Sequence, residues 1–159
     1  MSESMREQIF VALIAKLLTI TKAASYYNDV RQVYDPPVDL NKMNEFPSVN
    51  IIEGQETCAI SEIVGGHGAL LPNYFDVDFD CVLNEINTPR QARSRMLADI
   101  QKLLGINYQI PTPEDVGTAS NCQYKGSAPW GVQGTRPLVG ITISYRVWYR
   151  QRVNNPVSN

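Results

Sequence analysis

Apolar residues recur at helical spacing close to the N-terminus. Ser4 and Glu7 have the spacing of a capping box, which satisfies free amide groups at the start of a helix. The apolar positions that follow at steps of three and four are Ile9, Phe10, Leu13, Ile14, Leu17 and Leu18. This spacing predicts an amphipathic helix that fades near residues 21–23, with an apolar side that another element must cover.

Downstream, the pattern changes to alternation with a period of two, which is typical of strands. Two short segments rich in β-forming residues, 30–35 and 48–53, predict the first two strands. The clearest strand spans residues 75–83, where an apolar face alternates with a mostly acidic one. The positions on that second face are Asp76, Asp78, Asp80 and Val82.

A second helix and a last strand follow. Thr88 as N-cap, Pro89 at the first helical position and Gln91 at the capping-box position predict a helix that ends at Gly105. The last strand is expected over residues 138–151, with one apolar face. Its other face carries Thr142, Ser144, Arg146, Trp148 and Arg150.

These elements predict an α+β fold with the order α-β-β-β-α-β. Each helix has one apolar stripe and each good strand one apolar face, so we expect a four-stranded, mainly antiparallel sheet with two helices packed on one face. The other face is left uncovered. Residues 106–136 lack periodicity and contain several prolines and glycines, which predicts a long loop. Residues 1–152 are expected to form a single domain, and residues 153–159 a flexible tail.

Composition narrows the function classes. The chain has 159 residues, 14 basic and 16 acidic, and its formal net charge of -2 lacks the basic excess of a nonspecific nucleic-acid binder. Its three cysteines form no CxxC pair, which argues against a structural zinc site and favours reduced thiols in a cytoplasm. The apolar run near the N-terminus is too short to span a bilayer, so we expect no membrane or targeting segment.

The acidic residues of the strand over residues 75–83 have a spacing that also occurs in calcium-binding loops. Asp76, Asp78 and Asp80 match the first, third and fifth positions of an EF-hand loop. The sixth and twelfth positions, which need glycine and glutamate, are Cys81 and Asn87. The pattern therefore favours a strand surface, and we predict no metal, cofactor or catalytic residue.

Two further chemistries remain as alternatives. His67, the only histidine, lies between glycines, which favours a turn, although His67 with Asp78 and Asp80 could serve a small metal-dependent hydrolase. A nucleic-acid-binding module would use basic clusters, although surface arginines on an amphipathic helix are usually only solvated. The clustered arginines are Arg90, Arg93 and Arg95 in the second helix, and Arg146, Arg150 and Arg152 near the end of the last strand.

The layout as a whole resembles the tail terminator (tail completion) proteins of long-tailed bacteriophages. The resemblance covers nearly the whole chain and consists of patterns of residue type. The segments that carry it are residues 6–18, Tyr34-Asp-Pro-Pro-Val38, Phe46-Pro-Ser-Val-Asn-Ile-Ile52, Phe75-Asp-Val-Asp-Phe-Asp80, residues 90–104 and Ile141-Thr-Ile-Ser-Tyr-Arg-Val-Trp-Tyr149. The chain departs from a compact family pattern in its 106–136 loop and its 57–73 insertion.

The resemblance implies a structural protein of the virion tail and neck, assembled in the host cytoplasm and without an active site. Such a protein forms a ring of identical copies, commonly six, that caps the head-proximal end of the tail tube and stops its growth. Its partners are further copies, the tail tube protein and a neck or head-completion protein, and DNA passes through without specific binding. Another neck component, such as a head-closure or adaptor protein, or a tube-like subunit, is the nearest alternative.

In a ring of this kind, the uncovered sheet face would line the channel or form an interface between copies. A mildly acidic surface would let DNA pass without gripping its phosphates. The side chains expected to face the channel, or an interface, are Asp76, Asp78, Asp80, Arg146, Trp148 and Arg150.

Overall fold

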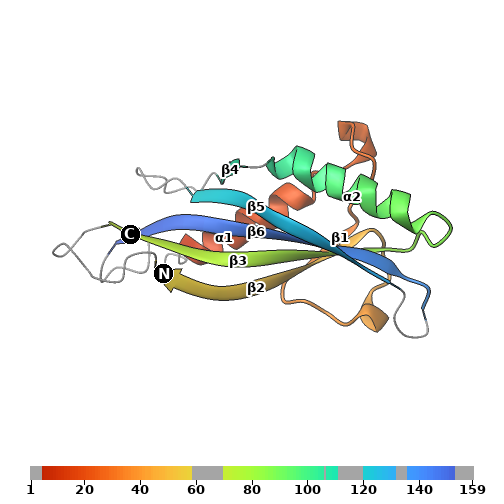
Figure 1. The fold of residues 1–159 in the computed structure, drawn as a ribbon, viewed down its shortest axis with the longest axis horizontal. Coiled ribbons are helices and arrows are strands. Elements are labelled where there is room, and N and C mark those ends of the chain that lie inside the picture. The colour runs from red at the N-terminus through yellow and green to blue at the C-terminus, as the bar shows by residue number, and fades with distance from the viewer. Residues whose placement is uncertain (1–4, 59–69, 106, 111–119, 132–135, 153–159) are drawn as a thin grey trace.

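The computed structural model describes residues 5–58, 70–105, 107–110, 120–131 and 136–152; for residues 58, 70–72, 107–110, 120 and 150–152 it describes the backbone alone. These residues form an α+β fold with two α-helices and two short 3-10 helices (Figure 1). The elements in chain order are α1 (Met5–Leu17), η1 (Lys22–Ala24), β1 (Gln32–Tyr34), η2 (Leu40–Lys42), β2 (Ser48–Cys58), β3 (Leu70–Leu83), α2 (Pro89–Leu104), β4 (Asn107–Ile110), β5 (Ser120–Trp130) and β6 (Val139–Arg152).

The sheet is wider than the pattern predicted. The described residues form a six-stranded sheet in the order β1-β2-β3-β6-β5-β4, in which β1 pairs with β2 in parallel and all other neighbours are antiparallel. The expectation of four strands was therefore wrong, although the sheet is mainly antiparallel as predicted. Strands β3 and β6 form its centre and pair along their whole length, from Leu70↔Arg152 to Leu83↔Val139.

The missing strands come from the segment predicted to be a loop. Residues 106–136 contain the whole of β4 and β5, so the prediction of a loop was wrong for the described part of the segment. A register shift between Tyr124 and Gly126 interrupts the alternation of β5, and Pro129 near its end is tolerated because half of β5 lies at a sheet edge. The two features together removed the period-two signal.

Both predicted helices are present, although α1 ends at Leu17, before the predicted end near residues 21–23. Helix α1 buries Ile9, Phe10, Leu13 and Leu17, whereas Leu18, which was placed on the apolar stripe, is 45% exposed just beyond the helix end. The capping residue expected at Ser4 lies outside the described residues.

Helix α2 begins at Pro89 and is closed by Gly105, whose backbone N–H donates to the Gln101 carbonyl. Thr88 is the N-cap residue as predicted, but its side chain makes no capping hydrogen bond. The apolar side chains that the helix buries are Met96, Ile100, Leu103 and Leu104.

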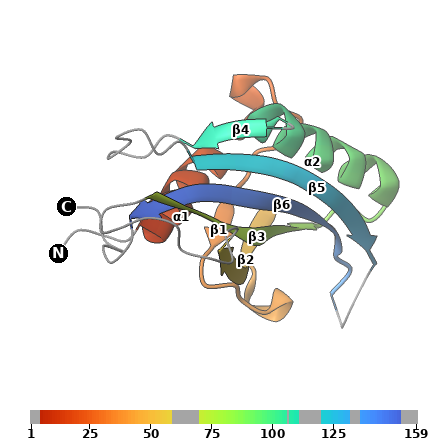
Figure 2. The ribbon, with the colours of Figure 1, turned by 60° about the vertical axis from the view of Figure 1, so that its left-hand side comes forward.

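The main core lies between the helices and one face of the sheet (Figure 2). The predicted inward positions of β3, namely Phe75, Val77, Phe79, Cys81 and Leu83, are all buried. The ring of Phe10 in α1 stacks on Phe75 at a centroid distance of 5.3 Å. Each such side chain contributes roughly 1.5–3 kcal/mol on burial, so this layer is what fixes α1 and α2 on the sheet.

We call the opposite face of the sheet the outer face. It was expected to be uncovered, but one end of it is covered. Val82 on β3 is completely buried there, in a second small cluster with Met43 and Leu138. Residues 35–47, between β1 and β2, cover this end of the face, and Asn50 holds them by bonding both the N–H and the carbonyl of Val38. Among the described residues, this cover does not reach the other end of the outer face, toward Trp148, which we call its open end.

No helix in the described part of the chain is long and apolar enough to cross a membrane. The C-terminal tail, residues 153–159, lies outside the described residues.

Candidate functional site

The open part of the outer face gathers the predicted site residues into cross-strand pairs. Because side chains alternate between the two faces of a strand, Asp76, Asp78 and Asp80 all lie on this face of β3. The register of β3 against β6 places them opposite Arg146, Ser144 and Thr142, respectively. Each of these pairs is hydrogen-bonded.

Asp76 and Arg146 form a bidentate ion pair. Arg146 donates from Nε to Oδ1 at 2.7 Å and from Nη2 to Oδ2 at 3.1 Å, and its Cζ lies 4.4 Å from the ring centroid of Tyr74. The hydrogen bond from Arg146 lowers the pKa of the Asp76 carboxyl below its ordinary value, and the same bond raises the pKa of Arg146. The charge of Asp76 is therefore neutralised within the subunit.

Asp78 and Asp80 are bonded differently, because all their donors are neutral. Ser144 Oγ donates to Asp78 Oδ1 at 2.5 Å, while Thr142 Oγ1 and Trp130 Nε1 both donate to Asp80 Oδ1, at 3.0 and 2.7 Å. Neither carboxylate forms an ion pair within the described residues. The two side chains are thus held in place while their negative charges stay uncompensated.

Trp130 is a site residue that the sequence pattern missed, because it lay in the predicted loop. Its indole lies directly on Gly140, where an added Cβ would come within 2.0 Å of the ring. Arg93 of α2 fixes this end of β5 and β6 by donating to the carbonyls of Gly140 at 3.0 Å and Trp130 at 2.5 Å. The sequence spacing had grouped Arg93 with Arg90 and Arg95 in a basic cluster. In the structure, Arg93 instead stabilises the fold through these two hydrogen bonds.

An aromatic pair lies at the open end of the outer face. Trp148 contacts Tyr74 across β6 and β3 at a centroid distance of 4.7 Å, and both are partly exposed. Ile52 on β2, opposite Asp78 in the register, is 40% exposed on the same face of the sheet. Arg150 also belongs to β6, but its side chain lies outside the described residues.

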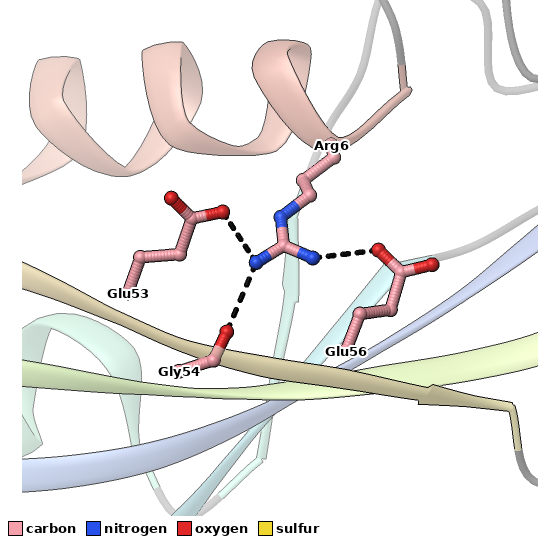
Figure 3. A network of polar contacts seen from close by, with 4 residues as sticks. All are labelled: Arg6, Glu53, Gly54 and Glu56. Carbon is pink, nitrogen blue, oxygen red and sulfur yellow. Dashed lines mark hydrogen bonds and ion pairs between the residues drawn. The ribbon is translucent and has the colours of Figure 1, made fainter.

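A separate polar network anchors the start of α1 on the helix side of the sheet (Figure 3). Arg6 forms ion pairs with Glu53 and with Glu56, the latter at 2.6 Å, and donates to the Gly54 carbonyl at 3.0 Å. A register shift in β2 between Glu53 and Glu56 brings both carboxylates around the same guanidinium, whose Cζ lies 4.5 Å from the ring of Phe75. This network positions the helix on the sheet.

Two buried thiols lie on the opposite side of the sheet from the outer face. Cys81 and Cys122 are buried on the helix side and unpaired among the described side chains, and burial raises the pKa of both, that of Cys122 to about 12. His67 lies outside the described residues. Within the described residues, no group of three or more His, Cys, Asp or Glu side chains is placed to hold a metal ion.

Comparison with known families and with curated proteins adds no assignment: no family model and no curated protein matches the chain.

Proposed function

We propose that this chain is a structural assembly protein of a bacteriophage tail. Copies of it form a ring, a hexamer in the simplest case, that caps the head-proximal end of the tail tube. The ring ends tube elongation and joins the tail to the neck. The resemblance of the sequence layout to tail terminator proteins supports this proposal.

The structural observation that carries the proposal is the preorganised outer face. Its charged side chains are fixed by cross-strand hydrogen bonds, so little side-chain entropy is lost when another surface docks on them. Trp148, Tyr74 and Arg146 lie in contact at its open end, and these are the residue types that dominate binding energy in protein interfaces. A rigid surface of this composition suits assembly with another protein.

A ring needs a heterologous interface, in which one surface of each copy meets a different surface of the next. The molecule offers such a difference, because the outer face is a polar and aromatic sheet surface while the opposite side presents the solvent faces of α1 and α2. Of the two roles that the sequence left open for the outer face, we therefore favour the interface over the channel lining.

Light scattering on a sizing column, with and without the tail tube protein, tests the proposal. We expect a closed oligomer and tubes of bounded length in the presence of the protein. Infected-cell lysates lacking the protein should contain overlong tube polymers, whereas leaking heads would indicate a head-closure protein instead. A species that stays monomeric even with tube protein would contradict the proposal.

A further inference from the structure

We propose that the outer face of one copy binds the solvent face of α2 in the next copy. This inference rests on the proposed ring and names the two surfaces that close it. We call the second surface the basic face and define it by Arg90, Arg95, Lys102 and the neighbouring Tyr27.

The basic face carries positive charge without compensation along α2. Arg90, Arg95 and Lys102 are exposed, and none of them forms an ion pair within the described residues. The acidic residue of the helix, Asp99, is 1% exposed and has its oxygens occupied by Tyr27 and Asn28. Arg90 lies in the first turn, where the helix dipole makes a cation unfavourable unless an anion from elsewhere approaches.

The outer face supplies the anions. Asp78 and Asp80 are rigidly held and lack a cationic partner in the described part of the subunit. By strand geometry, Asp78 and Asp80 lie about 7 Å apart along β3, and by helix geometry Arg95 and Lys102 lie about 10 Å apart along one side of α2. Long arginine and lysine side chains can bridge this difference. The two surfaces thus match in charge and in length.

Each surface also exposes a large side chain with apolar area beside its charges. Tyr27 is 60% exposed next to Arg95, whose Cζ lies 5.8 Å from its ring, and Ile52 is 40% exposed next to Asp78. An interface that covered both would bury apolar area at its centre and pair charges around it, which is the usual composition of a specific contact.

The two surfaces lie on opposite sides of the sheet, because α2 packs on the helix side (Figure 2). Binding between them is therefore head-to-tail: every copy uses its basic face toward one neighbour and its outer face toward the other. A contact of this type closes into a ring when the rotation between copies permits.

The test uses two variants of the full chain that each disable one surface. Arg90→Glu/Arg95→Glu reverses the basic face, and Ile52→Arg/Asp78→Asn places a cation on the outer face while the asparagine can still accept from Ser144. The control, Arg31→Glu/Lys42→Glu, makes the same charge change as the first variant at two exposed residues that belong to neither of the proposed contact patches. Thermal unfolding verifies that all three fold.

Each surface variant alone should assemble with a dissociation constant raised at least about tenfold, whereas the control should assemble like the wild type. Mixing the two surface variants should restore one intact contact and give a one-to-one dimer without rings. Rings from either variant at wild-type concentrations would overturn the inference but leave the proposed function standing. Loss of duplex-DNA retention in the Arg90→Glu/Arg95→Glu variant, with rings intact, would assign the basic face to nucleic acid. A wild-type chain that never oligomerises would overturn both proposals.

Discussion

Asp99 is the residue whose removal most sharply tests how the helix layer is held together. Although it is an acidic residue on an amphipathic helix, it is 1% exposed. Its Oδ1 accepts from the Tyr27 N–H at 2.9 Å, and its Oδ2 accepts from the Asn28 N–H at 2.9 Å and from Asn28 Nδ2 at 2.8 Å. These bonds tie the segment after η1, and with it Tyr27 of the basic face, to α2.

The expected cost of Asp99→Ala follows from these contacts. Hydrogen bonds to a charged group contribute about 1.5–3 kcal/mol each, and two backbone donors would lose their acceptor. Removing the carboxylate also removes its own desolvation cost, which offsets part of the loss. We expect the free energy of unfolding to fall by about 3 kcal/mol. Asp99→Asn should lose about half as much, because one carboxylate oxygen is replaced by a donor that faces the Tyr27 N–H or those of Asn28.

Urea unfolding followed by far-UV circular dichroism measures both changes. Gln101→Ala is the matched control, since Gln101 is exposed on the same helix, and it should stay within about 0.5 kcal/mol of the wild type. An Asp99→Ala variant as stable as this control would refute the reasoning, because the three bonds would then contribute nothing net.

Three further predictions follow from the sheet. Arg6→Ala removes the contacts of Figure 3 and should cost about 1–2 kcal/mol in urea unfolding, with Arg6→Lys recovering only part of it; equal stability would contradict the anchoring role. Gly140→Ala forces the indole of Trp130 off the strand and should shift its fluorescence, measured in a Trp148→Phe background; an unchanged spectrum would contradict the close contact. The pKa of Asp76 is lowered in the folded state, so its stabilising effect is present above its unfolded pKa and disappears as the pH falls through its folded pKa. Asp76→Asn should therefore cost up to about 1 kcal/mol at pH 7 and nothing once the wild-type carboxyl is protonated, and a cost that persists there would exclude the charge as its cause.

Strong periodicity decided which parts of the fold were predictable from the sequence. Helices α1 and α2 and the central strands β3 and β6 have uninterrupted apolar stripes or alternation, and all four were predicted. Strands β4 and β5 were missed because β4 is short and a register shift disrupts β5. The cover formed by residues 35–47 was missed because it depends on a tertiary contact with Val82 that no local pattern encodes.

The candidate site was likewise predictable only in part. Alternation alone placed Asp76, Asp78 and Asp80 on one face, and likewise Arg146 and Trp148, because the period-two rule needs only the strand itself. The partner of each carboxylate depends on the register between β3 and β6. This register is set by how the two strands pack together, which the sequence of one strand does not reveal. The signal for Trp130 would have been Gly140, a glycine in the middle of a strand pattern, which often marks a close approach.

We propose above that the outer face binds another copy of the chain. An image of the purified assembly, at a resolution that shows side chains, tests it most directly. We expect a closed ring in which Asp78 and Asp80 of every copy are covered by α2 of its neighbour. A ring in which these carboxylates line the central channel or point into solvent would contradict it.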